Sequence, residues 1–121
     1  EETAFVTDWT VYLVIDASRV GITEESDLPL QYSLEQNYPN PFNPTTTIDY
    51  TIAEAGQVQV VVFDILGNRV KTLVNRQQSP GHYSVTWNGI NASGQSVSTG
   101  VYFYRIHTGK YTNMKKMIFA K

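Results

Sequence analysis

Short segments that alternate apolar and polar residues are the feature that most constrains the fold of this 121-residue chain. Such alternation places every second side chain on the same face of a β-strand. Turn signals that contain Gly, Pro, Asn or Ser separate the segments at short intervals. The alternating segments are residues 46–52, 57–64, 69–74, 81–87, 100–107 and 112–119. No stretch places apolar residues at helical spacing between helix caps, so the pattern predicts an all-β protein.

Three of these segments each offer three apolar side chains to one face, as a two-layer core requires. The sets are Ile48, Tyr50 and Ile52; Val58, Val60 and Val62; and Tyr83, Val85 and Trp87. A further strand near Tyr38 would bring the total to six or seven. The sequence therefore predicts an antiparallel immunoglobulin-like β-sandwich of about seven strands, with Trp87 anchoring the core between the sheets.

The N-terminal part of the chain differs from the rest in charge. Residues 1–35 hold eight acidic residues and one basic residue, whereas residues 36–121 hold three acidic and eight basic ones. Residues 5–15 alternate with two largely apolar faces, which predicts a strand covered on both sides. Residues 18–34 form an acidic stretch that contains Gly, Ser and Pro, a composition typical of a linker. The predicted organisation is an N-terminal strand in 1–17, an acidic linker in 18–34 and the sandwich in 35–121.

Three prolines fall within eight residues at positions 37–44. Proline fixes φ and lacks an amide donor, so this stretch cannot be a helix or a central strand. We expect an extended, turn-rich segment whose Tyr38 and Phe42 side chains insert into the core.

The composition argues against most site chemistry. The chain has no Cys and only two His, His82 and His107, which excludes thiolate chemistry and a multi-His metal cage. Beyond residue 35 the only carboxylates are Asp49, Glu54 and Asp64, which fall on different predicted elements. We therefore expect no enzyme activity, no metal and no cofactor.

Two classes of partner are also disfavoured. An acidic pI of about 5.6 and the absence of a groove-reading motif argue against nucleic acid. No apolar run approaches the 18 or so residues that a membrane-spanning helix needs. Exposed Tyr and Trp side chains could bind sugars, so a carbohydrate-binding module remains a minor alternative.

Three motifs carry a resemblance to a known family. The first is QNYPNPFNPTTTI at residues 36–48, and the second is VFDILGNRV at residues 62–70. The third combines WNG at 87–89, Gly94 and STGVYFYR at 98–105, and is followed by KKMIFAK at 115–121. In this order they resemble the C-terminal sorting domain of proteins exported by the type IX (Por) secretion system. The Ig-like domain of the flagellar hook-capping protein shares that fold.

The resemblance implies a non-catalytic module that directs an attached protein to the surface or exterior of a Gram-negative bacterium. Its partners would be the type IX export machinery, reached through the periplasm, and a surface sortase-type protease. The implied sorting motif is Tyr38, Pro39, Asn40, Pro41, Phe42, Asn43 and Pro44. The implied turn and core signature is Asp64, Gly67, Trp87, Gly89, Gly94, Gly100 and Tyr102. The implied terminal docking strand includes Lys115, Lys116, Met117, Ile118, Phe119 and Lys121.

Two of the signature glycines have a physical reading of their own. Gly67 lies where a two-residue turn requires a positive φ. Gly100 precedes an aromatic strand, where it predicts a bulge or a close backbone approach.

The last predicted strand, 112–119, has no purely apolar face, which indicates an edge strand. A receptor could read such an edge by strand addition, with Lys115 and Lys116 steering an acidic groove. The plainer reading is that these lysines only discourage pairing with other chains.

In a longer parent chain, residues 5–15 would be the last strand of an upstream cargo domain, which is the origin that the resemblance implies. Without such a domain, the strand suggests a function of another class. An unpaired apolar strand is an aggregation hazard unless another surface covers it. Donation of this strand to the sheet edge of a neighbouring copy would build an open head-to-tail filament. The donated side chains would be Phe5, Trp9, Val11, Leu13 and Ile15.

Overall fold

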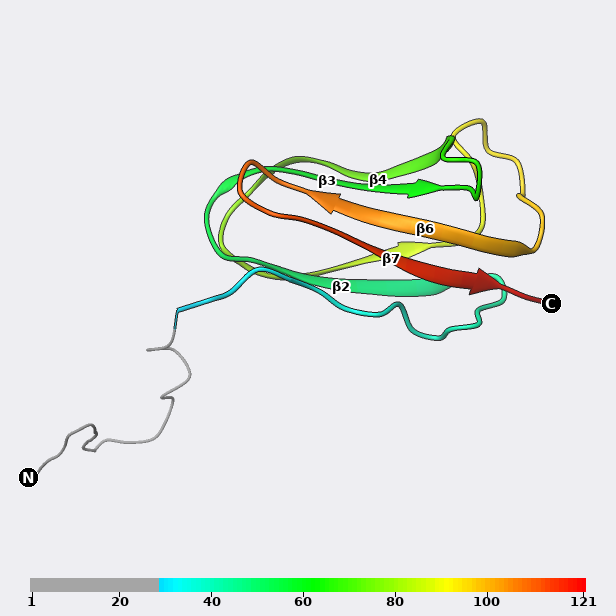
Figure 1. The fold of residues 1–121 in the computed structure, drawn as a ribbon, viewed down its shortest axis with the longest axis horizontal. Coiled ribbons are helices and arrows are strands. Elements are labelled where there is room, and N and C mark those ends of the chain that lie inside the picture. Colours follow the sequence, from blue (N-terminus) through cyan, green and yellow to red (C-terminus); the bar gives the residue numbers. More distant parts are fainter. Residues whose placement is uncertain (1–28) are drawn as a thin grey trace, which may run out of the picture.

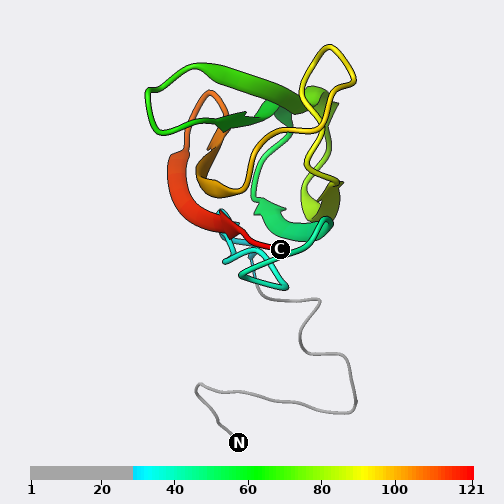
Figure 2. The ribbon, with the colours of Figure 1, turned by 90° about the vertical axis from the view of Figure 1, so that its right-hand side faces the viewer.

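The computed structural model describes residues 29–121 and contains seven strands in two antiparallel sheets (Figure 1). The strands are β1 (Ser33–Leu34), β2 (Thr46–Ile52), β3 (Gly56–Phe63), β4 (Arg69–Gln78), β5 (Gly81–Trp87), β6 (Gly100–His107) and β7 (Thr112–Phe119). One sheet has the order β1-β2-β5 and the other β4-β3-β6-β7. The end-on view in Figure 2 shows the two layers, and the predicted immunoglobulin-like β-sandwich is confirmed.

β4 is longer than the sequence predicts: it ends at Gln78, whereas the alternating pattern ends at Val74. The additional residues pair with the beginning of β3, from Asn75 opposite Gln59 to Gln78 opposite Gly56. β4 is an edge strand, and three of its last four side chains are exposed. An edge strand of this kind needs no apolar alternation, which explains why the pattern missed its second half.

The first strand lies inside the segment that the sequence predicts to be linker. Ser33 pairs with Thr51 and Leu34 with Tyr50, and the Leu34 side chain is buried in the core. No strand forms around Tyr38, which makes only an isolated bridge with Thr47. Residues 1–28, with the predicted strand in 1–17 and most of the predicted linker, lie outside the described residues.

The inward alternation is confirmed for the central strands. Both three-residue sets of β2 and β3 are buried, and Tyr83 and Val85 pack partly buried against the same cluster. Trp87 is buried on β5 of one sheet, and its ring meets Tyr102 on β6 of the other at 5.4 Å between centroids. The indole N–H donates to the Ile90 carbonyl at 2.9 Å, which satisfies its only donor. Trp87 therefore anchors the core between the sheets, as predicted.

Within residues 29–121 there is no helix long and apolar enough to cross a membrane.

The contact between Gly89 and the Phe119 ring yields a stability prediction. Gly89 has a φ of +75°, and a Cβ there would lie 3.0 Å from the nearest Phe119 ring carbon. Gly94 has a φ of +85° with open space around it, so it provides a matched control. Gly94→Ala should lose about 1–2 kcal/mol from backbone strain alone, and Gly89→Ala should lose more because the ring must also move.

Urea unfolding of both variants measures the difference in the free energy of unfolding. Equal losses at the two positions would show that close packing against Phe119 carries no cost.

Candidate recognition surface

Residues 36–45, here called the proline-rich segment, bond to the outer edge of the chain at the end of β7. The Phe42 amide donates to the Ile118 carbonyl at 2.9 Å, and the Ala120 amide donates to the Phe42 carbonyl at 3.0 Å. The Asn40 side-chain oxygen accepts from the Ile118 amide at 3.0 Å. The Gln36 side chain donates to the Lys116 carbonyl at 2.7 Å. We call residues 36–42 and 116–120 together the composite edge.

The composite edge corrects the expectation that β7 is open to strand addition. Four backbone groups that an edge strand would leave unpaired already have partners: the Lys116 carbonyl, both groups of Ile118 and the Ala120 amide. A receptor strand, or a strand donated by a second copy, would have to displace the proline-rich segment from residues 116–120. Proline lacks a donor, but the Asn and Phe residues between the prolines supply the hydrogen bonds.

A buried polar cluster fixes the start of the proline-rich segment. The Asn37 amide donates to the Tyr104 hydroxyl at 2.8 Å, and that hydroxyl donates to the Glu35 carbonyl at 2.7 Å. The Asn37 side chain donates to Thr46 Oγ1 at 2.9 Å and to the Pro39 carbonyl at 3.1 Å. Burial raises the pKa of Tyr104 to about 12, so its hydroxyl remains a donor at neutral pH.

Sequence reasoning missed the roles of Asn37, Thr46 and Tyr104. The available signal was Tyr104 itself, which alternation places in the core. A tyrosine buried there requires a hydrogen-bond partner.

The two aromatic side chains of the predicted motif differ in burial. Phe42 is 1% exposed, as predicted, and its ring stacks on Phe119 at 5.0 Å and tilts against Trp87 at 5.7 Å. The prediction that Tyr38 also enters the core is wrong, because its side chain is 80% exposed. Both backbone groups of Tyr38 bond to Thr47, so the residue is held in place while its ring remains in solvent.

The terminal strand divides in the same way. Met117 and Phe119 are buried in the core, whereas Lys116, Lys121 and Ile118 are exposed. Lys115 is half-buried, so it is less accessible to a partner than its neighbour. Of the predicted motif, the prolines, Asn40 and Asn43 are exposed beside this strand. The structure thus brings the predicted motif and the terminal strand together, and each contains both buried and exposed residues.

Asp64 and Gly67 of the signature lie in the loop between β3 and β4, where Asp64 makes hydrogen bonds within the loop. Asp64 Oδ1 accepts from the Leu66 and Asn68 amides at 2.9 Å each, and these bonds hold the pKa of its carboxyl below the usual value. The Asp64 amide donates to the Asn68 carbonyl, which closes a three-residue loop, not the predicted two-residue turn. Gly67 adopts its expected positive φ, at +86°.

The prediction of a close approach or bulge at Gly100 is wrong. A Cβ there would meet nothing within 4 Å, and Gly100 pairs with Phe119 without a register shift. Its φ of +148° is the property that favours glycine. The two register shifts of this sheet lie between β3 and β4.

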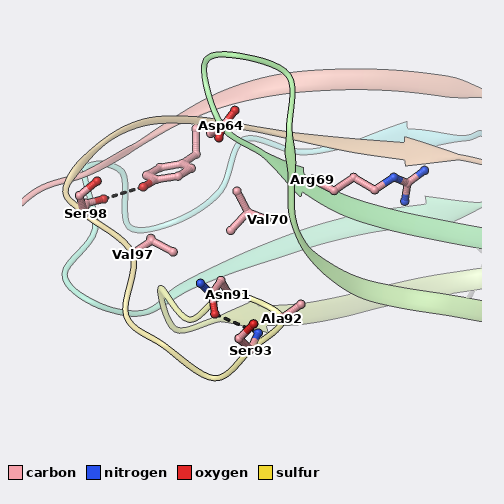
Figure 3. Close-up of a pocket in the computed structure, with 9 residues that line it drawn as sticks. Asp64, Arg69, Val70, Asn91, Ala92, Ser93, Val97 and Ser98 are labelled. Carbon is pink, nitrogen blue, oxygen red and sulfur yellow. Dashed lines mark hydrogen bonds between the residues drawn. The ribbon is translucent and has the colours of Figure 1, made fainter.

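A cavity of about 360 Å³ lies beside the β3–β4 loop, lined in part by Asp64, Arg69, Asn91 and Tyr102 (Figure 3). The Asn91 side-chain oxygen accepts from the Ser93 amide, and the Tyr102 hydroxyl donates to the Ser98 carbonyl at 2.6 Å. Asp64 caps its own loop. The Asp64 carboxylate, the Asn91 side-chain oxygen and the Tyr102 hydroxyl are therefore engaged within the protein, which limits the polar recognition that the cavity offers a ligand.

Fold and surface together define a small immunoglobulin-like β-sandwich in which the proline-rich segment covers the end of β7. The family model of the FlgD Ig-like domain matches residues 43–111, more than half of the chain. The chain therefore belongs to the FlgD Ig-like domain family. No curated protein sequence matches it.

Solved structures of similar fold come from two settings. Dimeric latent PorU from Porphyromonas gingivalis aligns with a TM-score of 0.60 and 18% identity, over 75% of this chain and 10% of PorU. PorZ from the same organism, a surface component of the type IX secretion system, aligns with a TM-score of 0.50 and 24% identity, over 74% of this chain and 11% of PorZ. FlgD from Xanthomonas campestris aligns with a TM-score of 0.51 and 20% identity, over 72% of this chain and 65% of FlgD. These likenesses show the fold, and the chain spans only a small part of PorU and PorZ.

The difference in burial between Phe42 and Tyr38 yields a second stability prediction. Phe42→Ala should lower the free energy of unfolding by about 3–5 kcal/mol, since it empties a fully buried aromatic site. Tyr38→Ala should stay within about 0.5 kcal/mol of the unchanged protein, since the ring is in solvent. Chemical denaturation measures both. A Phe42→Ala loss no larger than that of Tyr38→Ala would show that the ring does not anchor the segment.

Proposed function

We propose that this domain is a non-catalytic sorting module that directs an attached protein through the type IX secretion system. The destination is the surface or exterior of a Gram-negative bacterium. The observation that carries the proposal is the composite edge. Two sequence motifs that resemble those of sorting domains, 36–48 and 115–121, meet there in one hydrogen-bonded surface. PorZ, a type IX surface component, contains a region of the same fold.

A hook-capping type of assembly role is the second candidate, because the family match is to the FlgD Ig-like domain. That match covers residues 43–111 and so leaves out both halves of the composite edge. The part of the chain beyond the family match is therefore the part that the sorting proposal uses. The shared sandwich alone is compatible with either role, so the sorting proposal rests on the composite edge.

The titratable groups support a non-catalytic role. His82 shares a hydrogen bond with its cross-strand partner Thr51 at 2.9 Å. His107 does the same with Thr112 at 2.8 Å. Three carboxylates are similarly engaged: Asp49 with Ser84, Glu54 with Lys110 and Asp64 with its loop amides. Among residues 29–121, groups held in such local pairs stabilise strands and turns, which is in keeping with a non-catalytic role.

In this proposal the export machinery binds the displayed residues of the composite edge. Tyr38, Lys116 and Ile118 offer an aromatic ring, a cation and an aliphatic side chain on a backbone fixed by hydrogen bonds. A surface of mixed chemistry held in one geometry can be recognised without ordering cost. A sortase-type protease at the cell surface would be the second partner.

A reporter fused upstream of residues 1–121 tests the proposal in a type IX-competent host. The unmodified fusion should reach the exterior. A variant with Tyr38→Ala and Lys116→Glu should remain folded, since both side chains are exposed. Its export should fall at least about tenfold, the equivalent of about 1.4 kcal/mol of recognition.

Arg76→Glu is the matched control, because it reverses an exposed charge on β4, at the far edge of the same sheet, and should leave export unchanged. Periplasmic retention of a folded, unmodified fusion would contradict the sorting role. Normal export of the double variant would contradict recognition at the composite edge.

A further inference from the structure

The outer face of the four-stranded sheet carries an ordered row of side chains. Strand register places Arg69 of β4 opposite Phe63 of β3, Phe63 opposite Phe103 of β6, and Phe103 opposite Lys116 of β7. The row therefore has a cation at each end and two phenyl rings between them. In the next row Arg105 of β6 lies opposite Met114 of β7. We call these six residues the aromatic–basic face.

Two guanidinium groups converge on one ring of this face. The Arg105 Cζ atom lies 4.9 Å from the Phe63 centroid, and the Arg69 Cζ atom lies 5.9 Å from it. Figure 3 shows the Arg69 side chain extending away from Asp64, the nearest carboxylate in sequence. The described carboxylates are Glu35, Asp49, Glu54 and Asp64, and among residues 29–121 the recorded ion pair is Glu54 with Lys110.

The positive charge of this face therefore has no counter-charge among the described residues. Arg105 Nε is buried and has no hydrogen-bond partner there. A guanidinium fork binds a carboxylate through two parallel hydrogen bonds. An incoming carboxylate would supply the counter-charge that the described residues lack.

Exposed apolar side chains on the same face indicate which chemistry a partner must have besides negative charge. Met114 is 49% exposed. Ile118, which follows Lys116 on the same face of β7, is 36% exposed. Arginine and aromatic residues are the types that contribute most at protein interfaces. A second copy would present the same cations, so symmetric self-association at this face is disfavoured.

We propose that the aromatic–basic face binds an acidic peptide segment of a partner protein, in which carboxylates flank aliphatic side chains. The carboxylates would meet Arg69, Arg105 and Lys116, and the aliphatic groups would cover Phe63 and Phe103. The inference does not depend on the sorting role, because it rests on the chemistry of this face. Its test is a binding measurement, so the two can fail separately.

The test titrates the full chain with the blocked peptide Glu-Leu-Glu-Val-Glu-Ile-Glu and follows backbone amide shifts. The expected shifts cluster at Phe63, Phe103, Arg105 and Met114. The Gln-for-Glu version of the peptide should bind at least about tenfold more weakly. Arg105→Gln and Arg69→Gln should each weaken binding by about tenfold, and so should raised salt, since charge-assisted pairs are involved.

Arg76→Gln is the matched control, because it removes an exposed arginine from the other end of β4 and should bind as the unchanged chain does. If Arg105→Gln unfolds, Lys116→Gln replaces it in the test. The Lys116 side chain is exposed, so this variant should stay folded and bind the peptide more weakly. Equal binding of both peptides would overturn the proposal. Equal shifts with inorganic phosphate would assign the face to small anions instead.

A further variant separates a partner from the chain's own acidic segment. Glu24→Gln, Glu25→Gln and Asp27→Asn remove three acidic residues of residues 18–34. Peptide affinity should not change. A tenfold or greater gain would mean that this segment occupies the face, which would contradict a partner protein as the occupant.

Discussion

Insertion of the Phe42 ring between Trp87 and Phe119 is the contact on which the composite edge depends. The ring stacks on Phe119 at 5.0 Å, and this places the Phe42 backbone against Ile118 and Ala120. An individual backbone hydrogen bond at a sheet edge contributes little net stability, because water competes for it. Burial of the aromatic ring supplies the larger free energy, and the hydrogen bonds then set the register. Gly89 permits the arrangement, since a Cβ there would press on the Phe119 ring.

The sequence was sufficient to predict the β-sandwich. It was not sufficient to predict that the proline-rich segment covers the edge of β7. Alternation identified β2, β3, β5, β6 and β7 within about one residue, because a strand with one buried face has a strict period of two. It failed where no such face exists, as in the polar second half of β4. Nothing in the proline-rich segment has a period, so the inward turn of Phe42 and the outward turn of Tyr38 were indistinguishable. The bonds between residues about 80 positions apart, such as Gln36 to Lys116, leave no local signal at all.

β7 links the two surfaces that carry the functional proposals. Its edge is covered by the proline-rich segment, and its outer face continues the row that runs from Arg69 to Lys116. Lys116 belongs to both surfaces: its carbonyl accepts a hydrogen bond within the composite edge, and its exposed side chain lies where that edge meets the outer face. Immunoglobulin-like sandwiches serve many functions, so the fold alone does not select one. Both halves of the composite edge lie outside residues 43–111, the range that the family model matches.

Native-state hydrogen exchange tests the composite edge most directly. The amides of Phe42 and Ala120 bond across the edge, whereas the β6–β7 ladder reports the stability of the sheet itself. If the proline-rich segment is an integral part of the sheet, these two amides should open with free energies within about 1 kcal/mol of the ladder amides. Exchange of Phe42 and Ala120 at the rates of an unstructured peptide, with the ladder still protected, would contradict the account.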